Sequence, residues 1–299
     1  MLSKLFAYER VTIPIHTINE LQLYGSFYRG SKNQTYKGTI LYFHGGGLIF
    51  GHREDMPKKY ISLLTENGYG LLALDYLLAP ESKLPAIMQA IHRSIEWFMK
   101  EGLHTLKIDP SNYYVMGRSA GGYLALYHAV HASVRPRGVI VFYGYYTLSD
   151  ASFTVPSRHF LNYPKVSDKM IQQLVGNQPI SSAPTDQRYP LYLAARQRGD
   201  WLSVILDDTD HQRTYSLTKE QLMGLPPTFI TAAHQDPDVP VRQAKWLHKY
   251  IPESTLHIVE SNEHDFDRTH IDTLGINTYT VLVEWLNNPQ QKYKLKGII

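Results

Sequence analysis

YYVMGRSAGG, residues 113–122, joins a short apolar run to a serine flanked by glycines and to the start of a helical pattern. In a Gly-x-Ser-x-Gly arrangement of this kind, the serine lies on a sharp turn from a strand to a helix with its hydroxyl exposed. Glycines at 117 and 121 relieve the crowding that side chains would cause there. N–H groups at the start of the helix can bind developing negative charge. A glycine-rich turn with an incidental serine also fits these residues, so the motif needs support from elsewhere.

A glycine run at 44–47, His-Gly-Gly-Gly, directly follows the apolar run TILYF at 39–43. Consecutive glycines let the backbone approach a ligand closely, and their N–H groups suit an oxyanion hole, whose donors lie about 3 Å from the transition-state oxygen. The alternative is a flexible turn or a phosphate-binding loop, but neither a GxGxxG pattern nor a Walker lysine is present. We therefore expect backbone donors at this loop.

Eight short apolar or aromatic runs, bounded by turn residues, predict eight strands. They lie at 11–15, 21–28, 39–43, 70–74, 113–116, 138–143, 228–233 and 255–259. The first two runs alternate more and predict an antiparallel edge, whereas the other six are typical of strands covered on both faces. Helical patterns lie between them, near 56–66, 84–99, 120–132, 238–250 and 272–287. This alternation predicts a doubly wound, mostly parallel α/β sheet flanked by helices.

The alternation of strands and helices stops between Tyr145 and Leu225, where scattered aromatic residues accompany helical patterns. We therefore predict an α/β core formed by residues 1–144 and 226–299. The segment 145–225 is predicted to be an inserted helical cap that lies above the carboxyl ends of the strands.

A serine hydroxyl becomes a nucleophile when a base takes its proton, so a histidine oriented by a carboxylate is required. The chain has 14 histidines, and His264 is selected because it follows the last predicted strand. Carboxyl ends of strands meet at one edge of such a sheet, which is where the serine turn also lies. Asp236 follows the preceding strand most closely, with Asp238 as its rival. The order Ser119, Asp236, His264 is the one expected for this type of sheet.

The composition argues against several other classes of protein. No cysteine is present, which excludes disulfides, thiolate nucleophiles, iron–sulfur clusters and cysteine-ligated zinc. A net charge of +3 with no long basic run gives no reason to expect a nucleic-acid partner. Apolar runs are too short for a signal-peptide core or a membrane helix. We expect a globular, cytoplasmic protein without a stable membrane anchor, and leave open whether it forms a homo-oligomer.

Two groups of residues raise the question of a metal site. His128 and His131 lie three residues apart on a predicted helix, where packing or solvent exposure explains them better than metal ligation. Histidine and aspartate residues also gather within 264–270, but a histidine that accepts a proton has to stay free of metal. We predict no metal and no cofactor.

Three motifs occur in order along the chain: FHGGGLIFG at 43–51, DYLLAPESKLPA at 75–86 and GRSAGG at 117–122. Together they resemble the α/β-hydrolase superfamily and, within it, the hormone-sensitive-lipase-like carboxylesterases. The resemblance implies an α/β-hydrolase fold. It also implies a serine carboxylic ester hydrolase, carboxylesterase- or lipase-like, that cleaves small-molecule esters through an acyl-enzyme intermediate.

Carried over to this sequence, the resemblance implies that Ser119 is the nucleophile, His264 the general base and then acid, and Asp236 the group that holds the imidazole. His44 would shape its loop without taking part in the chemistry. The oxyanion donors would be the backbone N–H group of Ala120 and N–H groups of the glycine run, above all those of Gly46 and Gly47 and then that of Gly45.

The match to the family departs from its pattern in three places. Arg118 stands where aspartate is usual, and Leu77 stands where arginine is common. Either the two positions have exchanged one polar arrangement, or the two changes are unrelated. The glycine run begins too early for the N-terminal cap common in this group, so any lid would come from 145–225. Asp265 replaces a glycine after His264, where it either raises the pKa of the imidazole or points to solvent.

Two further functions remain open on the sequence. Amide or peptide hydrolysis, as in acylaminoacyl peptidases or formamidases, uses the same residues, and DPDVP at 236–240 resembles the acid loop of the peptidase branch. Some relatives of this fold are non-catalytic ligand receptors that have lost the histidine, whereas all three triad residue types are present here. The tyrosines Tyr143, Tyr145 and Tyr146 fit either pocket lining or ordinary packing at its rim.

Overall fold

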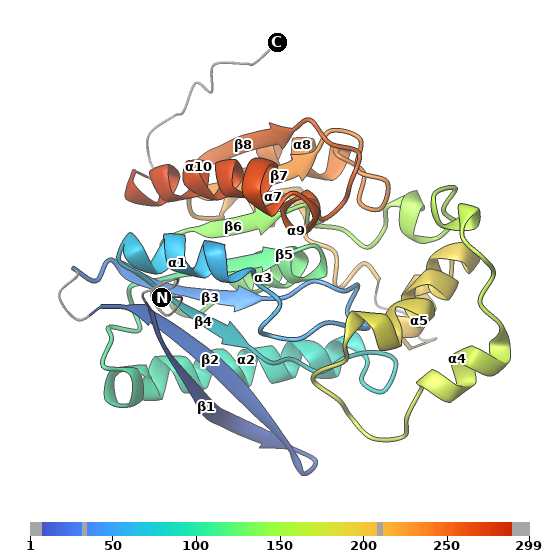
Figure 1. The fold of residues 1–299 in the computed structure, drawn as a ribbon, viewed down its shortest axis with the longest axis horizontal. Helices are drawn as coiled ribbons and strands as arrows, with labels where there is room; N and C mark the ends of the chain where they lie inside the picture. Colours follow the sequence, from blue (N-terminus) through green and yellow to red (C-terminus); the bar gives the residue numbers. More distant parts are fainter. Residues whose placement is uncertain (1–7, 32–34, 208–211, 289–299) are drawn as a thin grey trace, which may run out of the picture.

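The computed structural model describes residues 8–31, 35–207 and 212–288. One eight-stranded sheet runs through the molecule in the order β1-β2-β4-β3-β5-β6-β7-β8, which confirms the predicted α/β-hydrolase sheet (Figure 1). The strands are β1 Tyr8–Ile18, β2 Leu21–Gly30, β3 Gly38–Phe43, β4 Tyr69–Leu74, β5 Tyr113–Arg118, β6 Val139–Phe142, β7 Thr228–Ala233 and β8 Ser254–Val259.

The sheet is mixed, as predicted. Strand β1 pairs antiparallel with β2, and β2 pairs antiparallel with β4, whereas the pairs from β4 through β8 are parallel. Every residue of β3 to β7 is buried, because these strands are covered on both faces. In β1, by contrast, buried Ile13 and Ile15 alternate with exposed Thr12 and Pro14, so only one face of this edge strand meets the core.

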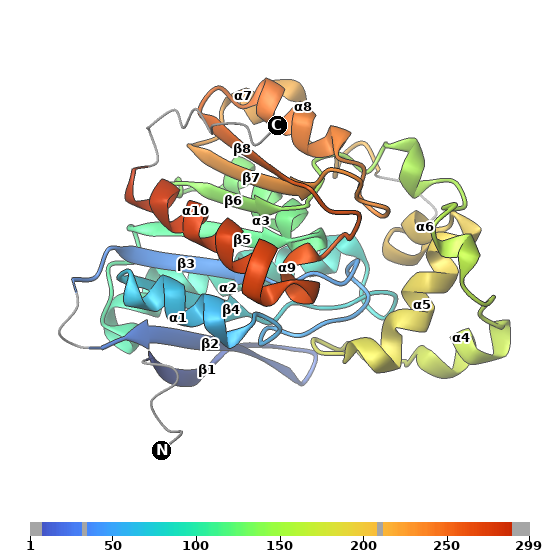
Figure 2. The same ribbon diagram turned by 45° about the horizontal axis from the view of Figure 1, so that its top comes forward.

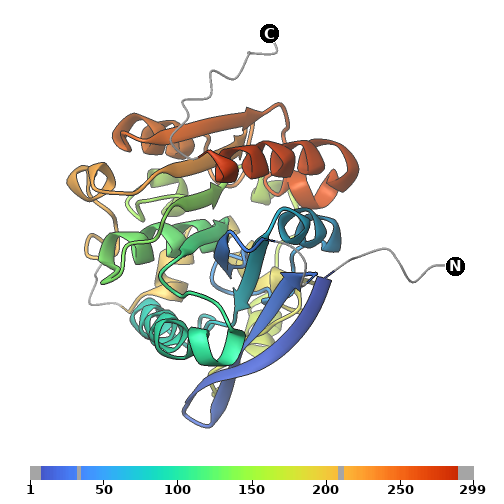
Figure 3. The ribbon, with the colours of Figure 1, turned by 90° about the vertical axis from the view of Figure 1, so that its left-hand side faces the viewer.

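Helices cover both faces of the sheet (Figure 3), with α1 and α10 on one face and α2, α3 and α8 on the other. Their bounds are α1 Lys58–Glu66, α2 Leu84–Glu101, α3 Ala120–His131, α8 Arg242–Tyr250, α9 Phe266–Thr269 and α10 Ile276–Asn287. The apolar residues Leu84, Ile87, Ile91 and Ile95 of α2 are buried because these positions recur on one side of the helix. Within the described ranges, no helix has the length and apolar character needed to cross a membrane.

The described part of the segment 145–225 forms helices and adds no strand to the sheet. It contains the short 3-10 helices Ala151–Phe153 and Phe160–Asn162, and α4 Asp168–Leu174, α5 Thr185–Arg198, α6 Trp201–Ile205 and α7 Lys219–Met223. Helices α4, α5 and α6 lie beyond the carboxyl ends of the parallel strands (Figures 1 and 2), whereas α7 packs on α8. The Arg188 guanidinium on α5 donates to both carboxylate oxygens of Glu81, at 2.8 and 2.9 Å, and so ties the segment to the loop before α2.

Strand register places the functional loops next to one another. Phe43 at the end of β3 pairs with Gly117 on β5, so the glycine run leaves the sheet at the level of the serine turn. Arg118 pairs with Phe142 at the end of β6, and the Ser119 N–H donates to the Phe142 carbonyl at 2.8 Å. The loops after β7 and β8 leave the same edge of the sheet. The carboxyl edge therefore gathers the segments that the sequence analysis singled out.

Candidate active site

Ser119 occupies a strained turn between β5 and α3. Its φ of 53° and ψ of −121° lie in a region that residues with a side chain rarely adopt. A Cβ atom at Gly117 would lie 1.9 Å from the Gly121 carbonyl oxygen, and one at Gly121 would lie 2.1 Å from the Phe43 carbonyl oxygen. Only glycine fits at either position, so the Gly-x-Ser-x-Gly pattern follows from backbone crowding, as expected of this turn.

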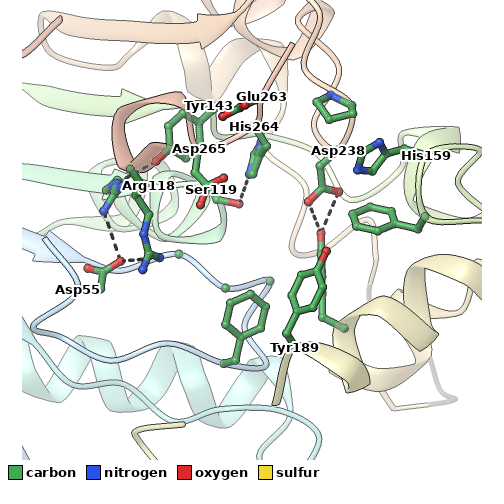
Figure 4. A pocket seen from close by; sticks show the side chains of 18 of the residues that line it. Asp55, Arg118, Ser119, Tyr143, His159, Tyr189, Asp238, Glu263, His264 and Asp265 are labelled. Carbon is green, nitrogen blue, oxygen red and sulfur yellow. Dashed lines mark hydrogen bonds and ion pairs between the residues drawn. The ribbon is translucent and has the colours of Figure 1, made fainter. Parts of the chain in front are cut away.

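The structure brings Ser119, His264 and Asp236 together in one hydrogen-bonded chain. His264 Nε2 lies 2.8 Å from Ser119 Oγ, and His264 Nδ1 lies 2.7 Å from Asp236 Oδ2. The Asp236 side chain is fully buried, while 16% of the His264 side chain is exposed. In Figure 4 the imidazole points at the serine hydroxyl from the loop after β8. The arrangement can move a proton from the hydroxyl to the imidazole and stabilise the resulting charge.

The two rival carboxylates have different partners. Asp236 Oδ1 accepts hydrogen bonds from the backbone N–H groups of Asp238 and Val239, both at 2.9 Å, which leaves Oδ2 directed at His264. The Asp238 carboxylate accepts from the Tyr192 hydroxyl at 2.7 Å and forms an ion pair with Arg196 at 3.1 Å. The geometry therefore favours Asp236 for the imidazole, while Asp238 anchors α5 to the same loop.

The surroundings of His264 favour its charged form. Burial of the imidazole lowers its pKa. The opposite effect is larger: the charge and hydrogen bond of Asp236, together with the charges of Asp238 and Asp265, raise the pKa to about 9. Asp265 therefore raises the pKa of the imidazole, which is one of the two possibilities that the sequence left open. The imidazolium that forms when the serine loses its proton is stabilised by the same charges.

The glycine loop lies directly against the serine. A Cβ atom at Gly45 would lie 3.3 Å from Ser119 Cβ, and one at Gly47 would lie 2.3 Å from the Tyr192 ring. Trp201 Nε1 donates to the Gly47 carbonyl at 2.9 Å, which fixes the loop from the side of α6. Ala120 begins α3, whose first N–H groups have no acceptor within the helix. Both segments thus lie next to the Ser119 side chain.

His44 is buried beside this loop and takes no part in the chain of hydrogen bonds. Its ring stacks on Tyr76 with centroids 4.2 Å apart, and the Tyr76 hydroxyl donates to the His44 carbonyl at 2.9 Å. Burial lowers the pKa of His44 to about 4, so the ring stays neutral. These contacts agree with a role in shaping the loop.

A cavity of about 350 Å³ opens above Ser119. Figure 4 shows Ser119 and His264 at its centre, with Asp55 and Arg118 on one side and His159 and Tyr189 on the other. Tyr143 lines this cavity, and its ring lies edge-on to the His264 ring with centroids 4.7 Å apart.

The other two tyrosines after β6 differ in their surroundings. Tyr145 lines a second, smaller cavity next to Ser119. Tyr146 packs against Trp246 and Tyr250, with ring centroids 6.4 and 6.5 Å away. Of the two sequence interpretations, pocket lining therefore fits Tyr143 and Tyr145, and ordinary packing fits Tyr146.

The site has the residues and fold of a known family. A sequence model described as alpha/beta hydrolase fold matches residues 40–268. The chain belongs to the α/β-hydrolases. This membership confirms the resemblance to that superfamily and to its hormone-sensitive-lipase-like esterases that the motifs indicated.

Two solved structures share about a third of their residues with this α/β-hydrolase. A Staphylococcus aureus protein of unknown function is 31% identical, with a TM-score of 0.83, over 94% of this chain and 100% of its own. An α/β-hydrolase superfamily protein from Enterococcus faecalis is 30% identical, with a TM-score of 0.80, over 93% of this chain and 98% of its own. A bacterial heroin esterase, 18% identical with a TM-score of 0.68 over 96% and 86% of the two chains, shares the fold.

Among curated proteins, human arylacetamide deacetylase-like 2 is 31% identical over 97 residues, which is 31% of this chain and 24% of that protein. A non-reducing polyketide synthase of Aspergillus calidoustus is 25% identical over 292 residues, 77% of this chain. This chain spans 12% of the length of the synthase, so the match concerns one part of a much larger protein.

Arg118, which departs from the family pattern, forms hydrogen bonds and ion pairs with residues of other segments. Its guanidinium donates to the Asp267 carboxylate at 2.9 Å and the Tyr143 hydroxyl at 2.8 Å, and lies 3.4 Å from Asp55. Leu77 is an ordinary core residue, 2% exposed. The carboxylates that balance Arg118 come from two other segments, so the changes at 118 and 77 are separate and not a swapped pair.

Sequence reasoning missed the residues of α5 and α6 that meet the site. Tyr192 and Arg196 hold Asp238, and Trp201 holds the glycine loop. The aromatic content of 145–225 was the available signal, but it did not say which rings point toward Ser119. Among the described residues, no group of three His, Asp or Glu side chains is placed to hold a metal ion.

Proposed function

We propose that this α/β-hydrolase cleaves carboxylic esters of small molecules through a serine nucleophile. The observation that carries the proposal is the hydrogen-bonded chain from Ser119 through His264 to Asp236 at the base of an open cavity. Support comes from the family membership and from the esterases among its structural neighbours, with which this chain shares the fold.

In the proposed reaction, Ser119 Oγ forms a bond to the ester carbonyl carbon while His264 Nε2 takes the hydroxyl proton. The negative oxygen is held by backbone N–H groups of Gly46, Gly47 and Ala120. When the carbon–oxygen bond to the alcohol breaks, His264 gives its proton to the departing oxygen. Water then adds to the acyl-serine with His264 again as the base, and the carboxylic acid leaves. Asp236 keeps Nδ1 protonated and the ring oriented throughout.

The test is hydrolysis of p-nitrophenyl acetate by wild type and by Ser119→Ala. We expect the substitution to lower kcat/KM at least about 10⁴-fold, because the nucleophile is lost. Ser182→Ala, which removes an exposed serine hydroxyl from 145–225, is the matched control and should keep wild-type turnover. A folded Ser119→Ala protein that still turns over the ester would overturn the assignment.

Amide hydrolysis is the second candidate, because the same residues attack an amide carbonyl. The printed name of the human relative refers to arylacetamides, and it is 31% identical over 97 residues. Rates for p-nitrophenyl acetate and p-nitroacetanilide separate the two candidates. We expect the ester to be strongly preferred, and comparable kcat/KM values on both would favour the amidase.

A ligand receptor without catalysis is the remaining alternative. A fluorophosphonate probe reacts only with an activated serine, so covalent labelling of Ser119 supports the hydrolase. A folded wild-type protein that resists the probe would favour the receptor.

A further inference from the structure

Two cavities of very different size meet at Ser119. The main cavity has a volume of about 350 Å³, and the second has about 10 Å³ on the same measure. A volume of about 10 Å³ holds one water-sized group. Gly47, Ser119 and Tyr192 line both, so the nucleophile stands at the junction of a large and a very small space.

The position of His264 shows which part of an ester would enter each cavity. The departing alcohol oxygen has to receive its proton from His264, so the alcohol lies on the side of the imidazole. His264 lines the main cavity, whereas the residues that line the small cavity do not include it. If Ser119 acts as proposed above, the alcohol occupies the main cavity and the acyl group points into the small one.

The walls of the small cavity are buried aromatic rings. Tyr145, Phe153 and Trp201 are 2 to 3% exposed. Their rings contact one another in pairs, with centroids 5.0 to 5.8 Å apart. An interior of this kind is densely packed, and extra methylene groups force costly shifts of its side chains.

Hydrogen bonds and charges hold these walls in place. Trp201 Nε1 donates to the Gly47 carbonyl at 2.9 Å, and the Tyr192 hydroxyl donates to the Asp238 carboxylate at 2.7 Å. The Arg196 guanidinium lies 5.5 Å from the Phe153 ring centroid. An acyl chain longer than acetyl would have to move rings that are fixed on more than one side.

The main cavity has a different character. Phe50, Tyr163 and Tyr189 line it with aromatic surface, and Asp55 and Arg268 add charge. It has the volume of a site for a sizeable molecule. Its mixed lining suits an alcohol that carries both ring and polar groups.

We infer that this chain is a deacetylase of bulky alcohols: the small cavity admits the methyl group of an acetyl ester and rejects longer acyl chains, while the main cavity takes the alcohol. This inference rests on the proposed function and adds to it the size of each half of the substrate.

The test compares p-nitrophenyl acetate, butyrate and octanoate, and separately methyl acetate and 1-naphthylmethyl acetate, whose alcohols are leaving groups of similar strength. We expect kcat/KM to fall at least about 10-fold from acetate to butyrate, since one methylene in a tight pocket changes rates about 10-fold or more. The naphthylmethyl ester should have a higher kcat/KM than the methyl ester, because its alcohol fills more of the main cavity. Equal rates on acetate, butyrate and octanoate would overturn the inference.

Variants of the cavity walls show whether these residues set the limit. Phe153→Ala should raise the butyrate-to-acetate ratio at least about 10-fold. Tyr163→Ala removes a ring from the main cavity instead and should leave that ratio within about 2-fold. Should Phe153→Ala fail to fold, Val239→Ala opens the same cavity by a smaller deletion and should shift the ratio in the same direction. An unchanged ratio in a folded variant would overturn the inference.

Failure of the proposed function looks different. In that case no ester of the series is hydrolysed and a fluorophosphonate does not label Ser119, which would overturn the hydrolase and this inference with it. Labelling and turnover without any preference for acetate would leave the hydrolase standing and overturn the inference alone.

Discussion

Arg118 and Asp267 form a buried ion pair, with Nη2 and Oδ1 2.9 Å apart and both side chains at most 2% exposed. Arg118 directly precedes Ser119 in the chain, and Asp267 lies three residues after His264. The pair therefore ties the serine turn to the histidine loop below the cavity. Tyr143 joins it, because its hydroxyl donates to Asp267 at 2.7 Å and its ring packs on His264.

Asp267→Asn should lower the free energy of unfolding by about 3–5 kcal/mol, because it leaves the buried guanidinium without its nearest charge partner. Urea unfolding followed by tryptophan fluorescence measures the loss. Arg198→Ala is the matched control: it breaks an ion pair with Asp168 whose side chains are 36% and 81% exposed. That change should cost at most about 1 kcal/mol, and equal losses in the two variants would contradict the prediction.

Asp236→Asn should lower kcat about 10⁴-fold with little change in KM, because the imidazole loses the acceptor that fixes its tautomer. The loss of kcat in Asp238→Asn should be smaller than the loss in Asp236→Asn by a factor of at least about 10. Its main effect should be a lower unfolding free energy, since it disturbs the contacts of Tyr192 and Arg196. Initial rates and urea unfolding of both variants provide the measurement. The reverse order of kcat values would assign the acid to Asp238.

The sheet could be predicted from the sequence because strands covered on both faces are continuous apolar runs. The serine turn was also predictable, since only glycine fits beside the backbone at 117 and 121. The choice between Asp236 and Asp238 depended on how one short loop closes. N–H groups of Asp238 and Val239 turn Asp236 toward the imidazole, and two residues of sequence separation do not encode that direction.

Contacts between distant segments could not be predicted in the same way. The carboxylate partners of Arg118 lie 63 and 149 residues away, at Asp55 and Asp267. Nothing in the local pattern around Arg118 points to either residue. The same holds for Trp201, which reaches Gly47 from 154 residues away and closes the small cavity. Periodicity reports which face of an element is buried, whereas these contacts depend on where whole elements lie.

Gly47→Ala should lower kcat at least about 10²-fold, comparable to the loss of one oxyanion donor. The backbone at Gly47 has a φ of 60°, and an added Cβ would lie 2.3 Å from the Tyr192 ring, so the loop has to move. Gly176→Ala is the control, because its Cβ would lie 3.7 Å from the nearest atom and no positive φ is required. The measurement is kcat of both variants and of wild type on p-nitrophenyl acetate. A Gly47→Ala protein with wild-type kcat would contradict the prediction.

The pH dependence of kcat/KM should follow His264, whose pKa is raised to about 9. The imidazole accepts the serine proton only when neutral, so kcat/KM should rise about tenfold per pH unit well below 9 and level off above it. Asp265→Asn removes a charge that favours the imidazolium, so the midpoint should move to lower pH. Asp272→Asn, which removes an exposed carboxylate paired with Lys59, should leave the midpoint in place. A midpoint that does not move in Asp265→Asn would show that this carboxylate does not act on the imidazole.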